Sequence, residues 1–281
     1  MSRYPEMFRR LSEQDEGAFV PFVMLGDPTA ELSEAVIEAL IEGGADALEL
    51  GVPFSDPVAD GPTIQSAHIR ALEAGVGLRE SLQVVRRVRE RHPDLPIGLL
   101  IYGNVPFAVG LEEFYRLCAD SGVDSVLLPD VPVREGDAFS TAAHAAGVDP
   151  VYIAPPSAST STLDGVARRS RGYVYAVSRV GVTGTERASS TVGLAESVAR
   201  LRADAAAPVL LGFGISTPQQ VAEAIAAGAD GAISGSAIVR IIEEHVPALL
   251  SGETAERQAA LASLHDELVI FIAAMKAATR R

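Results

Sequence analysis

The chain has 281 residues, of which 48% are hydrophobic, so it is long enough to bury a large core as one domain or as two small ones. Its formal net charge of −14 argues against nucleic acid and against an anionic membrane surface as partners. A single cysteine, Cys118, excludes an intrachain disulfide framework and favours a reducing compartment. No uninterrupted apolar run approaches membrane-spanning length, so we expect a soluble, cytoplasmic protein without membrane or nucleic-acid partners.

Short apolar segments alternate with amphipathic helical patterns along the chain. Eight segments rich in β-branched residues recur at intervals of roughly 20–35 residues, which is the period of a strand–helix unit. The predicted strands are residues 19–25, 45–52, 96–102, 123–128, 150–154, 172–177, 208–213 and 231–234. The predicted helices are residues 6–16, 31–42, 65–73, 78–91, 111–120, 194–203, 218–227 and 254–278.

Four segments of the chain have nearly the same sequence: residues 42–48, 121–126, 146–151 and 227–232. Each reads as the end of a helix, a glycine turn and the start of a strand. Glycine is the usual residue just past a helix C-terminus. This repetition favours a closed barrel over an open sheet. We therefore predict an α/β fold, a (β/α)8 TIM barrel with an extra N-terminal helix, as one domain over residues 1–281. Residues 181–193, rich in Gly, Ser and Thr, are predicted to be a mobile loop.

Two carboxylates mark the second strand and the loop after it. Glu49 interrupts an otherwise apolar strand, and Asp60 follows eleven positions later, just before a helix that starts at Pro62. A buried carboxylate is costly unless it is partnered or its pKa is perturbed, and perturbed carboxylates concentrate at active sites. Two such groups at one strand-to-helix connection form a natural acid–base pair. Either residue alone is more often structural.

Glycine-rich turns follow the last two strands. In a barrel of this kind the functional groups gather at the C-terminal ends of the strands. Residues 212–216 (GFGIS) follow the seventh strand and residues 234–236 (SGS) follow the eighth. Glycines let backbone N–H groups approach an anion, and the next helix start adds its positive dipole end. The two turns together predict a phosphate site, although either alone is ordinary turn chemistry.

Four motifs closely resemble the tryptophan synthase alpha subunit family. They are residues 48–65 (LELGVPFSDPVADGPTIQ), 173–184 (YVYAVSRVGVTG), 212–215 (GFGI) and 235–239 (GSAIV). The resemblance covers essentially the whole chain. It implies a (β/α)8 barrel that cleaves indole-3-glycerol phosphate to indole and glyceraldehyde 3-phosphate. It also implies a partner beta subunit in an alpha2beta2 complex, which carries pyridoxal phosphate and receives the indole.

The resemblance also assigns roles to residues. It makes Glu49 the principal acid–base group and Asp60 the acceptor of the indole N–H. The implied substrate-binding residues are Phe22, Leu100, Tyr102, Leu127, Ile153, Tyr175, Thr183, Gly184, Phe213, Gly214, Gly235 and Ser236. The implied partner interface consists of Pro53, Asp56, Asn104, Asp130 and Pro132. The role of Tyr173 stays open between site and packing.

The chemistry of the remaining residues agrees with this assignment. An aldol cleavage needs an electron sink, which other aldolases supply with a lysine Schiff base or a metal. Lys276, the only lysine, lies beyond the eighth strand, and the five histidines lack metal-ligand spacing. We therefore expect neither a metal nor a cofactor in this chain, so that the protonated indole itself is the sink.

Two alternatives remain open from the sequence. One is a stand-alone indole-3-glycerol phosphate lyase or another phosphosugar-binding barrel enzyme. The other is a non-catalytic regulatory partner of a beta subunit.

Overall fold

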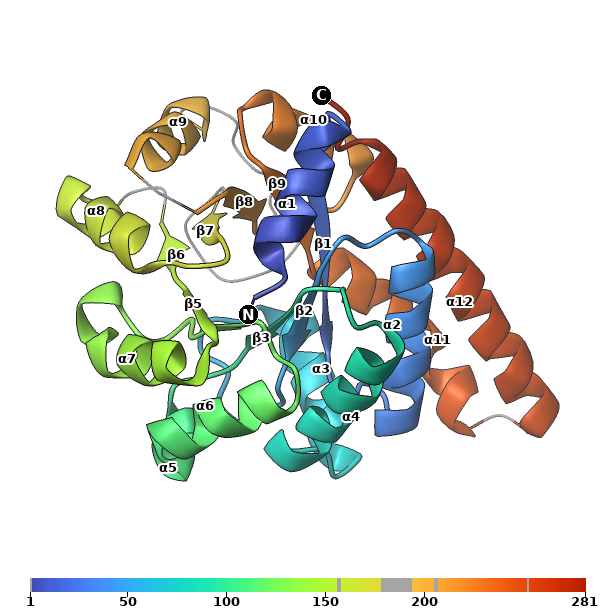
Figure 1. Ribbon diagram of the computed structural model, residues 1–281. Helices are drawn as coiled ribbons and strands as arrows, with labels where there is room; N and C mark the ends of the chain where they lie inside the picture. Colours follow the sequence, from blue (N-terminus) through green and yellow to red (C-terminus); the bar gives the residue numbers. More distant parts are fainter. Residues whose placement is uncertain (1, 156–157, 178–193, 205–206, 252) are drawn as a thin grey trace.

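The sheet is a nearly closed ring of parallel strands surrounded by helices (Figure 1). The computed structural model describes residues 2–155, 158–177, 194–204, 207–251 and 253–281. Within these residues the strand order is β5-β4-β3-β2-β1-β9-β8-β7-β6. The strands are β1 (Ala18–Met24), β2 (Leu48–Gly51), β3 (Ile97–Leu100), β4 (Ser125–Leu127), β5 (Asp149–Val151), β6 (Ile153–Ala154), β7 (Val174–Val177), β8 (Val209–Gly212) and β9 (Gly231–Ser234). The predicted (β/α)8 barrel is confirmed.

The fifth predicted strand closes the ring and is divided into two. β5 pairs with β4, and β6 pairs with β7, so one short segment joins the two edges of the sheet. Tyr152 separates them, and its phenol reaches outward to the Ser140 hydroxyl and donates to the Gly136 carbonyl oxygen. The eight predicted segments therefore correspond to nine observed strands.

Helices follow the strands and cover the outside of the ring (Figure 1). They are α1 (Tyr4–Glu13), α2 (Ala30–Glu42), α3 (Pro62–Glu73), α4 (Leu78–Arg91), α5 (Asn104–Val109), α6 (Leu111–Asp120), η1 (Val133–Glu135), α7 (Asp137–Ala146), α8 (Thr160–Arg169), α9 (Leu194–Asp204), α10 (Pro218–Ala226), α11 (Ser236–Ser251) and α12 (Thr254–Ala277). The predicted helices at 78–91 and 111–120 are confirmed to the residue. α1 ends at Glu13 rather than 16 because Asp15 has a φ of 56°, which a helix does not accept.

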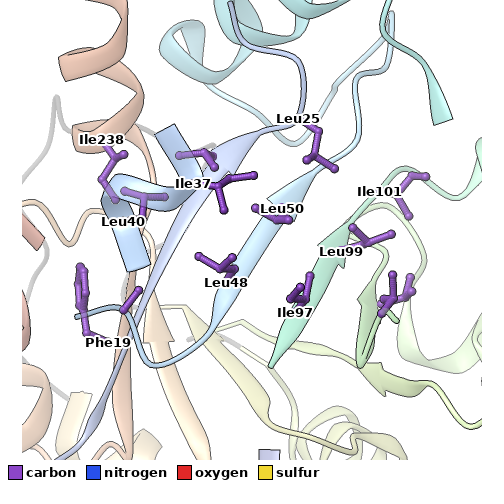
Figure 2. Close-up of a cluster of buried hydrophobic side chains, with 14 of the residues drawn as sticks. Phe19, Leu25, Ile37, Leu40, Leu48, Leu50, Ile97, Leu99, Ile101 and Ile238 are labelled. Carbon is purple, nitrogen blue, oxygen red and sulfur yellow. The ribbon is translucent and has the colours of Figure 1, made fainter. Parts of the chain in front are cut away.

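Alternate residues of each strand face the two sides of the ring, as the period of a strand requires. Leu48 and Leu50 of β2 point outward and pack with Ile37 and Leu40 of α2, as Figure 2 shows. The residue between them, Glu49, therefore points into the barrel. Phe22, Leu100, Leu127, Tyr173, Tyr175, Leu210 and Ile233 form the inner apolar cluster. Position in the strand thus decides which side chains reach the site.

The extra N-terminal helix, α1, closes the bottom of the barrel. Tyr4, Met7 and Leu11 of α1 belong to the inner apolar cluster. The Tyr4 ring packs edge-on against the Tyr173 ring at 5.4 Å, and its hydroxyl lies 2.9 Å from the Ser125 hydroxyl. Water is thereby kept away from the inner residues at the end opposite the C-terminal ends of the strands.

The last helix, α12, corrects one expectation from the sequence. By length and composition alone it is apolar enough to cross a membrane, with a mean hydropathy of 1.3 over its best window. It packs along α2 and α11 (Figure 1). Its buried residues include Leu264, Leu268 and Ile272. One such helix is weak evidence for a membrane, because packed helices of water-soluble proteins pass the same test.

Asp124 holds the bottom of the barrel together. It is buried just before β4 and accepts hydrogen bonds from the Ile97 N–H at 2.8 Å and from the Arg89 guanidinium at 2.7 Å. The backbone N–H and the guanidinium of Arg3 donate to its other carboxylate oxygen at 3.0 and 2.9 Å. One carboxylate thus joins the start of α1, the end of α4 and two strands.

Asp124→Ala is expected to lower the free energy of unfolding by about 3–5 kcal/mol, because it leaves the largely buried Arg89 guanidinium without its carboxylate partner and the Ile97 N–H without its acceptor. Urea unfolding followed by circular dichroism measures the change. The control is Asp120→Ala, whose partner Arg116 is exposed on α6 and which should leave stability nearly unchanged. Equal effects of the two substitutions would contradict this account.

Candidate active site

Glu49 lies inside the barrel with only 1% of its surface exposed. It is the inward residue of β2, and in the sheet it pairs with Phe22 of β1 on one side and Gly98 of β3 on the other. The Tyr173 hydroxyl donates a hydrogen bond to the Glu49 Oε1 at 2.8 Å. Tyr173, whose role the sequence left open, is therefore the partner of the buried carboxyl group.

The environment of Glu49 gives it the properties of a proton-transfer group. Burial raises the pKa of the Glu49 carboxyl from 4.5 to about 7. The hydrogen bond from Tyr173 opposes this rise, and the negative charge of Asp60 adds to it. A carboxyl group with a pKa near 7 is present in both protonation states at neutral pH, so it is able to give and to take a proton.

Asp60 is also buried, and it reaches the site from the loop between β2 and α3. The Tyr102 hydroxyl donates to its Oδ2 at 2.7 Å, and the His68 Nε2 lies 3.1 Å from the same oxygen. α3 begins at Pro62, a position where the missing N–H of proline costs no hydrogen bond. Asp60 therefore lies at the end of the loop, two residues before the first residue of the helix. The two carboxyl groups thus line one cavity from different positions of the same strand–helix unit.

The cavity has a mainly apolar lining and holds about 460 Å³ of space outside atoms, part of it open to solvent. Its lining residues are Phe22, Glu49, Asp60, Ile64, Leu100, Tyr175, Phe213, Gly214, Ile215, Ile233, Gly235 and Ser236. The two carboxyl groups and the apolar side chains therefore face the same cavity.

The rim above strands β8 and β9 carries the glycine-rich turns. Gly214 has a φ of 81°, a conformation that favours glycine, and α11 begins at Ser236 directly after Gly235. The Ser234 hydroxyl donates to the Ile215 carbonyl oxygen at 2.7 Å and so joins the two turns. The N–H groups at the start of the sixteen-residue helix α11 form a suitable place for an anion.

Gly212, the last residue of β8, leaves room for a neighbouring side chain. A Cβ atom there would lie 2.2 Å from the Tyr175 hydroxyl oxygen. Tyr175 needs this space because it lines the cavity and packs edge-on against Phe213, with ring centres 5.8 Å apart.

The structure brings nine of the predicted substrate-binding and catalytic residues to the cavity wall: Phe22, Glu49, Asp60, Leu100, Tyr175, Phe213, Gly214, Gly235 and Ser236. Tyr102 lies behind Asp60 instead of on the wall, while Leu127 and Ile153 pack within or against the inner apolar cluster. Thr183 and Gly184, and the predicted mobile loop 181–193, lie outside the described residues.

Sequence reasoning missed four residues at or near the cavity. Ile64, Ile215 and Ile233 line it, and His68 contacts Asp60 from behind. Ile233 could have been found from strand alternation, because Ala232 of β9 faces the outer core and the next residue must face the barrel interior. The other three sit on a helix or a turn, where no periodic signal points toward the barrel mouth.

The predicted partner residues occupy the loops at the same end of the barrel. Asp56, Asn104, Asp130 and Pro132 are exposed, whereas Pro53 is buried. The Gly103 N–H donates to the Asp130 Oδ1 at 2.8 Å, which ties the loop after β3 to the loop after β4.

The positions of Lys276 and the histidines bear on cofactor chemistry. Lys276 pairs with Glu16 and Asp46 near the starts of β1 and β2, at the end of the barrel away from the cavity. Among the described residues, no group of three His, Cys, Asp or Glu side chains is placed to hold a metal ion.

These features define a class: a (β/α)8-barrel enzyme that works by acid–base chemistry on a small ligand with an apolar part and an anionic end. Comparison with known proteins makes the assignment more specific. The family model described as "Tryptophan synthase alpha chain" matches residues 8–269. The chain belongs to the tryptophan synthase alpha chain family. Membership makes it a lyase of tryptophan biosynthesis that acts on indole-3-glycerol phosphate.

Relatives and solved structures agree over the full length. The tryptophan synthase alpha chain of Corynebacterium diphtheriae is 57% identical over 282 residues, which cover 100% of both chains. That of Photobacterium profundum is 52% identical and covers 100% of this chain and 99% of its own. The crystal structure of tryptophan synthase subunit alpha from Legionella pneumophila superposes with a TM-score of 0.84 at 29% identity, covering 99% of this chain and 98% of that one. A structure of Mycobacterium tuberculosis tryptophan synthase gives 0.83 at 30% identity, covering 100% and 99%.

Burial of Glu49 has a consequence for stability. Its folded-state pKa is raised above the unfolded value, so its contribution to stability is fully present below about pH 4.5 and is lost as the pH rises through about 7. Glu49→Gln removes this loss. The variant is expected to be more stable than the wild type by about 2–3 kcal/mol at pH 8.5, with a smaller difference at pH 5.5. Urea unfolding at the two pH values measures it.

The matched control is Glu113→Gln on the exposed face of α6, whose carboxyl pKa is lowered by Arg116. That group is ionised at both pH values, so its substitution should show no change between them. A Glu49→Gln variant whose stability relative to the wild type is the same at both pH values would contradict the raised pKa.

Proposed function

We propose that this chain cleaves indole-3-glycerol phosphate with Glu49 as the acid–base group and Asp60 as the group that accepts the indole N–H. The observation that carries the proposal is the buried Glu49 carboxyl, with a pKa of about 7, lining the same apolar cavity as Asp60. The products are indole and glyceraldehyde 3-phosphate.

The reaction is a retro-aldol cleavage. Glu49 delivers a proton to C3 of the indole ring, which leaves the ring nitrogen as an iminium ion and creates the electron sink. The glycerol hydroxyl next to C3 then loses its proton to the Glu49 carboxylate as its carbonyl group forms. The bond between C3 and the glycerol carbon breaks, and its electrons return to the ring to give indole. The negative charge of Asp60 stabilises the iminium ion through the N–H group.

Substrate binding divides the cavity into two parts. Phe22 and Leu100 on the wall contact the indole, and the family resemblance adds Leu127 and Ile153 from the inner apolar cluster behind the wall. Gly214, Gly235 and Ser236 bind the phosphate through backbone N–H groups and a helix start, and Thr183 and Gly184 join them on grounds of family resemblance. Tyr175 and Phe213 lie between the two parts.

The same proposal includes a partner. The chain works in the cytoplasm as one domain, residues 1–281, with a beta subunit in an alpha2beta2 complex. Pyridoxal phosphate belongs to that beta subunit. Support comes from the loops after β2, β3 and β4, where the exposed predicted contact residues stand beside the exposed apolar side chains of Val58 and Phe107. These loops surround the cavity mouth, so a protein bound there is placed to receive indole.

Glu49→Gln tests the chemistry. The amide keeps the size of the side chain but neither gives nor takes the proton, so cleavage is expected to fall by at least about a thousandfold. Binding of 3-(indol-3-yl)propyl phosphate, a ligand that has no hydroxyl to deprotonate, should change by less than about threefold. Release of glyceraldehyde 3-phosphate, measured with and without a beta subunit, reports the first, and calorimetry reports the second.

The outcomes separate the alternatives. Cleavage by the wild type that ignores the beta subunit would make this a stand-alone lyase. A wild type that stimulates a beta subunit equally before and after the substitution, and never cleaves, would be a regulatory partner. Cleavage by Glu49→Gln at the wild-type rate would remove Glu49 from the mechanism.

A further inference from the structure

His68 lies on α3 behind Asp60, with 1% of its surface exposed, and both of its ring nitrogens are engaged. The Phe54 backbone N–H donates to its Nδ1 at 3.0 Å. Its Nε2 lies 3.1 Å from the Asp60 Oδ2. The imidazole therefore connects the beginning of the loop between β2 and α3 to the carboxylate near the end of that loop.

The hydrogen bond from Phe54 fixes the tautomer of this imidazole. A backbone N–H is always a donor, so the Nδ1 that receives it must be an acceptor and carries no proton. The ring proton is then on Nε2, which donates to Asp60. A neutral imidazole in one orientation can supply only this single donor.

Tyr102 makes the same kind of connection from the loop after β3, the strand that pairs with β2. Its hydroxyl oxygen accepts the Ala59 N–H at 3.1 Å and donates to the same Oδ2 of Asp60 at 2.7 Å. The three rings pack together, with Phe54 stacked on Tyr102 at 5.2 Å and His68 edge-on to Tyr102 at 6.2 Å. Two buried side chains thus bind both the backbone of the loop and one oxygen of the carboxylate.

We propose that His68 is a positioning residue for Asp60: its Nε2–H holds the carboxylate in the orientation that meets the indole N–H. This inference rests on the proposed function. With Oδ2 held by two donors from behind, the carboxylate cannot rotate freely, and its face toward the cavity is set before the ligand arrives. Preorganisation of this kind makes an acceptor effective, because no reorientation is needed during the reaction.

Two substitutions separate the two hydrogen bonds of His68. Gln places an amide N–H near the position of Nε2 and so keeps the donor to Asp60. Asn keeps an acceptor near the position of Nδ1, for the Phe54 N–H, but has no donor long enough to reach Asp60. Asp60→Asn serves as the reference for loss of the acceptor, because the amide oxygen is expected to turn to the Tyr102 and His68 donors and leave the NH2 group facing the ligand N–H. The control is His92→Asn, a histidine paired with Glu38 at the other end of the barrel.

The readout is the preference for an N–H group in the ligand. Affinities are measured by calorimetry for 3-(indol-3-yl)propyl phosphate and for its benzofuran counterpart, in which oxygen replaces the N–H. The wild type should prefer the indole ligand by about tenfold, and Asp60→Asn should abolish the preference. His68→Asn should reduce the preference at least about threefold with the benzofuran affinity unchanged, while His68→Gln should retain most of it.

Unchanged benzofuran affinity shows that the site is still folded, so a loss of preference cannot come from unfolding. If His68→Asn keeps the full preference, or weakens both ligands equally, His68 does not act through Asp60 and the inference is wrong. If Asp60→Asn itself keeps the preference, the role of Asp60 in the proposed function fails first, and the inference about His68 fails with it.

Discussion

Placing a carboxyl group in the middle of an apolar barrel is the constraint on which the rest of this structure depends. Glu49 is surrounded by inward side chains and closed off from below by α1, so its ionised form is destabilised and its pKa rises to about 7. The fold therefore accepts a cost in stability at neutral pH. What it gains is a proton-transfer group that is present in both protonation states near neutral pH.

Asp60 has a different task from Glu49, since it accepts the indole N–H, and its hydrogen-bond partners differ as well. Glu49 accepts a hydrogen bond from the Tyr173 hydroxyl, whereas Asp60 accepts hydrogen bonds from Tyr102 and His68 on the same oxygen. Donors stabilise a negative charge, and a fixed negative charge is what a developing cation on the indole nitrogen needs. Two carboxyl groups on one strand–helix unit thus take different roles because their surroundings differ, and each also acts on the other, since the charge of Asp60 raises the pKa of Glu49.

Most of the fold followed from the sequence because strands and helices carry local periodic signals. The outward pair Leu48 and Leu50 required that Glu49 face inward, and the glycine turns marked where helices stop. The division of the fifth strand at Tyr152 could not be predicted, because it depends on a hydroxyl group reaching α7 and the turn before it. His68 was missed for a similar reason: in a helical pattern it is one more polar residue, and only the folded loop brings Phe54 and Asp60 to its two nitrogens.

The carboxyl carbon of Glu49 gives the most direct test. Its titration can be followed by carbon NMR in protein labelled at the glutamate carboxyl carbon, with the resonance assigned by its absence in Glu49→Gln. The account predicts a midpoint at about pH 7, which moves to lower pH in Asp60→Asn because the neighbouring negative charge is gone. A midpoint between about 4 and 5 in the wild type, as for a solvated glutamate, would contradict the account.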